Sequence, residues 1–205
     1  MLHSIVHSAS QQSETNPTLI MLHGRGSDEH DLFGLKEHFD HRLTIYSLRA
    51  PQNFVWGGYT WFDLYEDGTV DEASFVRSTN EITEFIHTIE TKKLFLLGFS
   101  MGAIMSYFIA LTQPNVCTGI AALSGFAPLQ LESSYRLQEL HDLRIFISHG
   151  ISDPVIPISS ARKTKELLAR SNAHVSYNEY EMTHQINDAC LNDVTLWVKN
   201  LLSLT

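Results

Sequence analysis

Short runs of apolar residues alternate with amphipathic segments along most of this chain. The runs predict strands at residues 18–22, 43–48, 94–97, 119–124, 144–148 and 175–180, and the weak alternation of residues 2–8 predicts an edge strand. Strands that are apolar on both faces are typical of a parallel sheet covered by helices. The pattern therefore predicts an α/β fold, with a mostly parallel sheet and helices on both faces. The chain shows no repeat and no linker, so we expect one domain over residues 1–205.

The segments between the strands predict the helices, most of them with one apolar face, whereas residues 103–111 are apolar on every side and predict a buried helix. They cover residues 29–39, 72–90, 103–111, 159–171 and 186–202, with a shorter helix at residues 133–140. Ser27 or Asp28 is expected to cap the first of these helices. About twenty residues separate the strands at 119–124 and 144–148. That length leaves room for one short helix, so we expect no cap domain over the sheet.

A long loop rich in aromatic residues covers residues 52–70. A loop of this length inside a compact domain usually has a function. We expect Trp61 and Phe62 to line a substrate pocket. The alternative is that these aromatic side chains hold the loop against the core.

Composition and charge narrow the range of partners. The formal net charge is −9 and no basic cluster is present, so we expect no binding to nucleic acid or to anionic membranes. Cys117 and Cys190 lie in apolar segments, which fits a reducing compartment. Residues 1–12 lack the pattern of a signal peptide, and no apolar run approaches the length of a membrane span. We therefore expect a cytoplasmic protein without stable membrane insertion.

One strand ends at a serine between two glycines. Residues 98–102 read Gly-Phe-Ser-Met-Gly, a G-x-S-x-G pattern with a predicted strand before it and a predicted helix after it. In that context the serine lies on a strained turn with its hydroxyl exposed. Gly98 and Gly102 lack a Cβ, so strand and helix can approach closely around Ser100. The pattern alone also fits an inert Gly/Ser turn, but its context favours a nucleophile.

An acid and a base follow later strands. Asp153 comes directly after the strand at 144–148, and His184 follows the strand at 175–180. The carboxyl ends of parallel strands share one edge of the sheet, so Ser100, Asp153 and His184 are expected to meet there. Histidine titrates near neutral pH and can take the serine proton, while the aspartate fixes its tautomer.

Other histidines and acids fit these roles less well. Of the 11 histidines, His184 alone stands between the last strand and the last helix. His23 and His149 each stand in a His-Gly turn, where we expect them to shape the backbone. Asp63 is interpreted as a brace for its loop. Residues 28–31, Asp-Glu-His-Asp, suggest a metal site, but acidic residues also favour a helix start, and we expect no metal.

The oxyanion of an ester-cleaving serine needs hydrogen-bond donors. The backbone N–H of Met101 lies at a predicted helix N-terminus, next to the nucleophile. The backbone N–H of Arg25, after His23 and Gly24, is the natural second donor. We therefore expect Arg25 and Met101 to form the oxyanion hole through their main chain.

Six motifs in order resemble the phospholipase/carboxylesterase family of α/β-hydrolases, which includes acyl-protein thioesterases and bacterial carboxylesterases. They are LHGRGSDEHD (22–31), RAP (49–51), WFD (61–63), GFSMG (98–102), HGISDPVIP (149–157) and TH (183–184). The resemblance implies an α/β-hydrolase fold and no cofactor. It also implies the roles given above for the triad and the oxyanion donors. Arg25 and Met101 differ from the residues of eukaryotic thioesterases, so the bacterial branch is the nearer match.

The leading expectation is a serine carboxylesterase that hydrolyses small esters or thioesters through an acyl-enzyme. The alternative within enzymes is an acyl thioesterase or lysophospholipase acting on longer acyl chains. An alternative of another class is a catalytically silent binding module, which is disfavoured because Ser100, Asp153 and His184 are all present. The sequence leaves a homodimer open.

Overall fold

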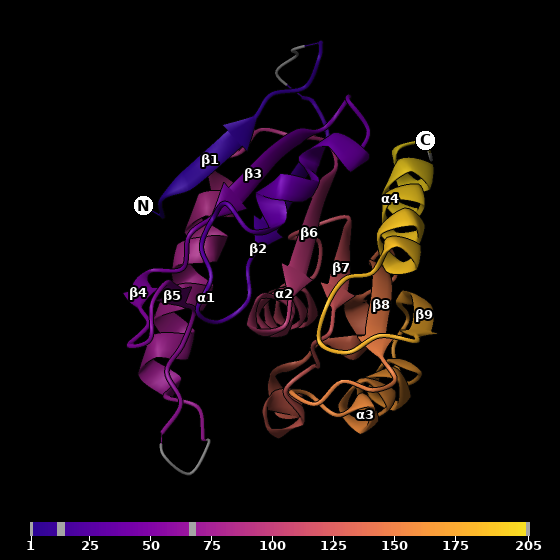
Figure 1. The fold of residues 1–205 in the computed structure, drawn as a ribbon. Coiled ribbons are helices and arrows are strands. Elements are labelled where there is room, and N and C mark those ends of the chain that lie inside the picture. Colours follow the sequence, from indigo (N-terminus) through magenta and orange to yellow (C-terminus); the bar gives the residue numbers. More distant parts are fainter. Residues whose placement is uncertain (1, 12–14, 66–68, 204–205) are drawn as a thin grey trace.

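The computed structural model describes residues 2–11, 15–65 and 69–203. In this part of the chain the main sheet has seven strands in the order β1-β3-β2-β6-β7-β8-β9 (Figure 1). Their bounds are β1 Ser4–His7, β2 Thr18–Leu22, β3 Thr44–Leu48, β6 Leu94–Phe99, β7 Gly119–Leu123, β8 Arg144–Gly150 and β9 His174–Tyr180. The edge strand β1 is antiparallel to β3, and the other pairs are parallel. The predicted α/β fold with a mostly parallel sheet is confirmed.

Helices cover both faces of the sheet, because successive strand residues point to opposite sides. In β2, Ile20 and Leu22 join one core cluster while Leu19 and Met21 join the other. The first cluster is covered by three helices, α1 (Glu72–His87), α2 (Met101–Thr112) and α3 (Ile158–Leu168). The second is covered by α4 (Asp188–Leu202) and the 3₁₀ helix η1 (Leu32–His38). The arrangement explains why the strands are apolar throughout.

The helix expected at residues 29–39 is wrong in type and in length. The structure has the 3₁₀ helix η1, which begins only at Leu32. Asp28 does not cap a helix; its Oδ1 accepts a hydrogen bond from the N–H of His30, 2.9 Å away, and closes a turn. The carboxylate of Glu29 is buried and accepts a bidentate hydrogen bond from the guanidinium of Arg49. This long-range ion pair holds the turn and displaces the helix start.

The long aromatic loop contains a small ribbon that the pattern does not predict. Strands β4 (Gln52–Asn53) and β5 (Tyr59–Thr60) pair in antiparallel fashion. Residues 66–68 of this loop lie outside the described part of the chain. The turn between the two strands contains Gly58, where a Cβ would lie 2.2 Å from the carbonyl oxygen of Gly26. The ribbon therefore packs against the turn that follows β2.

The segment between β7 and β8 has no cap domain. It contains two 3₁₀ helices, η2 (Leu129–Ser134) and η3 (Leu137–Glu139), in place of the single helix expected at residues 133–140. Neither of them buries a residue completely. The carboxyl edge of the sheet is therefore not enclosed by an inserted domain.

Candidate active site

Ser100 lies on a strained turn between β6 and α2. Its backbone has φ 53° and ψ −115°, a conformation that residues with a side chain rarely adopt. The N–H of Ser100 donates to the carbonyl of Leu123 on the next strand, which helps to hold the turn. A Cβ at Gly98 would lie 2.3 Å from the carbonyl oxygen of Gly102, and one at Gly102 would lie 2.0 Å from the carbonyl oxygen of Leu22. The close approach expected around Ser100 is present, and it requires both glycines.

His184 joins Ser100 to Asp153 by two hydrogen bonds. Its Nε2 lies 2.9 Å from the Oγ of Ser100, and its Nδ1 lies 2.7 Å from the Oδ2 of Asp153. The three residues follow β6, β8 and β9, so the common edge of the sheet brings them together. Because the carboxylate accepts the Nδ1 proton, Nε2 carries the lone pair that faces the serine hydroxyl. The pair can therefore remove the proton of Ser100.

Asp153 is a buried carboxylate with several donors around it. Its Oδ1 accepts hydrogen bonds from the N–H groups of Val155 and Ile156, at 2.8 and 2.9 Å. Burial acts to raise the pKa of Asp153, but hydrogen bonds from His184 and from these two N–H groups outweigh it and hold the pKa below its ordinary value. Asp153 therefore stays ionised beside the imidazole.

His149 supports the loop that carries Asp153. The side chain is buried, and its Nε2 lies 2.8 Å from the carbonyl oxygen of Ile156 and 3.4 Å from the Oδ2 of Asp153. A proton on Nε2 serves both oxygens, so the ring ties the end of the loop back to β8. A Cβ at the next residue, Gly150, would lie 2.3 Å from the carbonyl oxygen of Thr183. The expectation that His149 shapes the backbone is confirmed.

His23 acts in the same way on the turn after β2. The Nδ1 of this buried ring lies 2.7 Å from the carbonyl oxygen of Gly24, and its Nε2 accepts from the N–H of Ala50 at 3.1 Å. The Nε2 lone pair is thus in use, and Nδ1 carries the proton. The carbonyl of Gly24 and the N–H of Arg25 belong to one trans peptide group and point in opposite directions. By holding the carbonyl, His23 sets the direction of the Arg25 N–H.

Two N–H groups near Ser100 are free to bind an anion. In the described part of the chain, no hydrogen bond inside the protein uses the N–H of Arg25 or Met101. Met101 is the first residue of α2, where the helix leaves its N–H groups without acceptors. The Arg25 side chain turns away and stacks on Phe54, with its guanidinium carbon 4.4 Å from the ring centroid. These N–H groups are suited to stabilise the negative oxygen of a tetrahedral intermediate.

Trp61 and Phe62 lie in the core and do not form an open pocket wall. Trp61 is 0% exposed and Phe62 is 2% exposed. The indole Nε1 of Trp61 donates to the carbonyl of His23 at 2.9 Å, and its ring lies 5.3 Å from the imidazole of His23. The expectation that the two residues line the substrate pocket is therefore wrong, and the alternative of a loop held against the core is right. Burying the indole there needs an acceptor, and the turn after β2 supplies it.

A different pocket borders His184. Its volume is about 310 Å³, and its lining comes from η1, the end of β6 and the loop after β9. The lining residues are Asp31, Leu32, Leu35, Phe99, His184, Gln185 and Ile186. Sequence patterns do not single out the apolar members of this set, since nothing local shows that η1 lies beside His184.

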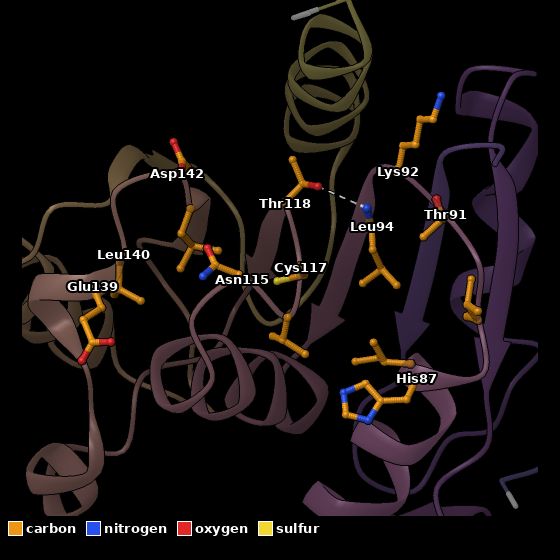
Figure 2. A pocket seen from close by; sticks show the side chains of 14 residues that line it. His87, Thr91, Lys92, Leu94, Asn115, Cys117, Thr118, Glu139, Leu140 and Asp142 are labelled. Atoms are coloured by element: carbon orange, nitrogen blue, oxygen red, sulfur yellow. Dashed lines mark hydrogen bonds between the residues drawn. The ribbon is translucent and has the colours of Figure 1, made fainter.

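The pocket of about 620 Å³ shown in Figure 2 is remote from these residues. It lies where β6 begins, at Leu94, with Lys92 and His87 on one side and Glu139 and Asp142 on the other. The six residues of β6 separate Leu94 from Ser100 by about 20 Å, at roughly 3.3 Å per residue. Its position at the amino edge of the sheet excludes a direct part in chemistry at Ser100.

The acidic segment at residues 28–31 does not form a metal site in this structure. Among the described residues, no group of three or more His, Cys, Asp or Glu side chains is placed to hold a metal ion. Glu29 is instead engaged by Arg49, with His3 and His30 within 3.3 and 3.4 Å of its Oε1.

None of the helices formed by the described residues is long and apolar enough to cross a membrane.

Comparison with known proteins identifies the family. The model of the phospholipase/carboxylesterase family matches residues 3–202. The chain belongs to the phospholipase/carboxylesterase family. It is an enzyme of the serine hydrolase type, and its sheet and helices form the α/β-hydrolase fold expected from the sequence.

Related proteins align with this chain over most of its length. Acyl-protein thioesterase 1 of Mycosarcoma maydis is 25% identical over 98% of each chain. Acyl-protein thioesterase 1 of Candida albicans is 32% identical over 69% of this chain and 68% of that protein. A solved structure of a Bacillus cereus carboxylesterase aligns with a TM-score of 0.86 at 23% identity, covering 98% of this chain and 94% of the other. At that identity the structural match shows a shared fold.

Proposed function

We propose that this protein is a serine carboxylesterase that hydrolyses carboxylic esters through an acyl-enzyme. Ser100 is the nucleophile, His184 the general base and Asp153 the residue that orients the base. The observation that carries the proposal is the chain of hydrogen bonds from Asp153 through His184 to Ser100, on a strained turn at the carboxyl edge of the sheet. Membership of the phospholipase/carboxylesterase family agrees with this proposal.

Acylation begins when Nε2 of His184 takes the proton of Ser100 and Oγ attacks the ester carbonyl. The carbonyl oxygen becomes an oxyanion, which accepts hydrogen bonds from the N–H groups of Arg25 and Met101. The imidazolium is stabilised by the ionised carboxylate of Asp153. It then returns its proton to the alcohol oxygen as the bond between carbon and that oxygen breaks. The products of this half-reaction are the free alcohol and an ester of Ser100.

Deacylation repeats these steps with water. His184 removes a proton from the water molecule as its oxygen attacks the acyl carbon, and the same N–H groups hold the oxyanion. The imidazolium then protonates Oγ of Ser100, which releases the carboxylic acid and restores the free enzyme. The imidazole is 16% exposed, so water reaches Nε2 once the alcohol has left.

A thioesterase function is the second candidate. The curated relatives named acyl-protein thioesterase 1 favour it, since they align over most of this chain. The same chemistry applies, with a thiol in place of the alcohol. A series of p-nitrophenyl esters, set beside an acyl-CoA and a lysophospholipid, distinguishes these activities by their values of kcat/KM.

The nucleophile is tested by a fluorophosphonate probe, which forms a covalent bond with an activated serine. We expect it to label the parent protein at Ser100 and to leave a Ser100→Ala variant unlabelled. The variant should fold normally and lose turnover by about 10⁴–10⁶. Labelling at another serine would overturn the assignment. A folded parent protein that is not labelled and hydrolyses no ester would instead favour a binding module.

The proposal also covers the domain, the substrate class and the location of the enzyme. We infer that residues 1–205 form one catalytic domain, because the family match covers residues 3–202. Its substrates are small esters or thioesters, and no cofactor takes part in the proposed chemistry. A cytoplasmic location is supported by the free, buried thiols of Cys117 and Cys190.

A further inference from the structure

The pocket beside His184 has a mainly apolar lining. Leu32, Leu35, Phe99 and Ile186 supply its hydrocarbon surface. The ring centroid of Phe99 lies 4.9 Å from that of His184, so the hydrocarbon surface extends directly from the catalytic imidazole. At about 310 Å³ the pocket is at the lower end of the range of small-molecule sites, roughly 300–1,000 Å³. It therefore suits a short apolar group.

The pocket is largely preformed. Leu32 is buried, and the core cluster around it includes Phe39 and Met182, with Leu35 and Ile186 packed against its side. Phe99 packs closely against the turn after β2, because a Cβ at Gly24 in that turn would lie 3.2 Å from the ring of Phe99. A preformed apolar pocket binds without a large ordering cost.

The direction of proton transfer decides which part of the substrate lies in this pocket. In acylation, Nε2 of His184 must give its proton to the alcohol oxygen, which therefore lies within hydrogen-bond reach of that nitrogen. The carbonyl oxygen is drawn instead toward the N–H groups of Arg25 and Met101. A pocket that has His184 in its wall thus lies next to the alcohol oxygen. We propose that this pocket is the leaving-group subsite and takes short, apolar alcohols.

The charge of the lining narrows the class of leaving group that this pocket accepts. Among the described residues of this pocket, Asp31 is the one carboxylate, and the lining includes no lysine or arginine. Asp31 is exposed at the rim, and the chain has a formal net charge of −9. An anionic leaving group is therefore repelled. The subsite favours neutral or cationic alcohols over carboxylate- or phosphate-bearing alcohols and thiols.

This inference rests on the proposed function, and an alcohol series at constant acyl group tests it. The substrates are the acetate esters of methanol, ethanol, n-propanol, n-butanol, choline and glycolate. Each value of kcat/KM is divided by the rate constant for hydroxide-catalysed hydrolysis of the same ester. We expect kcat/KM to rise by up to about fourfold per methylene from methyl to n-butyl acetate. The glycolate ester should react about fivefold or more slower than the n-propyl ester, and Asp31→Asn should reduce this difference.

A leucine variant tests the pocket itself. Leu35→Ala should flatten the alcohol series, because it lowers kcat/KM for n-butyl acetate more than for methyl acetate. Leu196→Ala is the matched control, because Leu196 is an exposed leucine on α4 and does not line this pocket. The control should keep the full dependence on alcohol length. If all the acetates share one acyl-enzyme and deacylation is slow, the differences appear in kcat/KM and not in kcat.

The possible failures are distinguishable. A flat alcohol series in a parent protein that is labelled at Ser100 and hydrolyses methyl acetate overturns the subsite and leaves the esterase function standing. The same holds if Leu35→Ala alters an acyl-length series of methyl esters but not the alcohol series, since the pocket then binds the acyl chain. Absence of both labelling and ester hydrolysis overturns the function and the subsite together.

Discussion

The N–H of Ala50 donates to Nε2 of His23 across 3.1 Å, which commits this buried ring to its neutral form. Burial lowers the pKa of His23, and the hydrogen bond to the carbonyl of Gly24 opposes that shift only in part. A proton on Nε2 would face the N–H of Ala50 and remove the acceptor. The ring therefore holds the turn that carries the proposed oxyanion donor only while it is neutral.

The first prediction is that His23→Leu lowers kcat by about 10²–10³ with little change in KM, because the Arg25 N–H loses its fixed direction. Steady-state kinetics on one ester measure both constants. His87→Ala is the matched control, since this histidine is exposed at the end of α1. Its kcat should equal that of the parent. Equal losses in both variants would show that His23 has no particular role in positioning the donor.

His23 also gives stability a defined dependence on pH. Its folded pKa lies below the ordinary value of 6.5, so the unfolded chain binds the proton more readily. The contribution to folding is complete above pH 6.5 and decreases as the pH falls below it. The free energy of unfolding, measured by urea titration between pH 8 and 5, should decline in the parent. His23→Leu should lack this part of the decline, and parallel curves would contradict the prediction.

The second prediction concerns the carboxylate of the proposed triad. Asp153→Asn should reduce kcat by about 10⁴, because the amide favours the wrong tautomer of His184. Asp63→Asn is the control, since Asp63 is exposed on the aromatic loop. It should change kcat by less than about tenfold. A larger loss for Asp63→Asn than for Asp153→Asn would show that the wrong acid has been chosen.

The third prediction concerns the ion pair between Glu29 and Arg49. Hydrogen bonds from Arg49 lower the pKa of Glu29 to about 2, from an ordinary 4.5. Glu29→Gln should cost about 1.5–3 kcal/mol at pH 7. Because the folded pKa is depressed, the difference between variant and parent is complete above pH 4.5 and shrinks as the pH falls toward 2. Urea titrations at a series of pH values measure it.

An exposed ion pair provides the control for that variant. Arg162 binds Glu179 through two hydrogen bonds, but the side chain of Glu179 is 24% exposed, against 1% for that of Glu29. Glu179→Gln should therefore cost no more than about 1 kcal/mol at pH 7. If the two variants lose the same stability, burial does not strengthen the pair at Glu29.

The fourth prediction uses the glycines around Ser100. Gly102→Ala should cost more than about 3 kcal/mol, because its Cβ would lie 2.0 Å from a backbone oxygen that cannot move independently of β2. Gly34→Ala is the matched control, as a Cβ there meets no atom within 4 Å. It should be neutral or stabilise the protein by up to about 1 kcal/mol. Thermal unfolding of both variants measures the contrast, and similar melting temperatures would contradict it.

Local patterns were sufficient for much of the fold and for the elements of the site. The apolar run of β6, the two glycines and the apolar segment of α2 predict the turn at Ser100 because each is a short-range signal. Asp153 and His184 are predicted to lie near Ser100 because both follow predicted strands, and parallel strands end at one edge. Once the sheet is parallel, its geometry brings the three residues together with little freedom left.

Long-range contacts decided what the patterns missed. The helix expected at residues 29–39 was lost because Glu29 is bound by Arg49, 20 residues away. The aromatic loop pattern predicts a pocket position for Trp61, yet a hydrogen bond to the carbonyl of His23, 38 residues away, holds it in the core. An amphipathic aromatic side chain fits a pocket or a core equally well by its own chemistry.

The sequence by itself thus determined the sheet, the helices α1, α2, α3 and α4 and the order Ser100, Asp153, His184, because apolar periodicity and turn residues act over a few positions. The tertiary structure alone decided which side chains border His184. Leu35 and Ile186 come from segments about 150 residues apart, and they line one pocket only because η1 packs against the loop after β9. Such proximity depends on how the elements pack across the edge of the sheet, which leaves no signal in either segment alone.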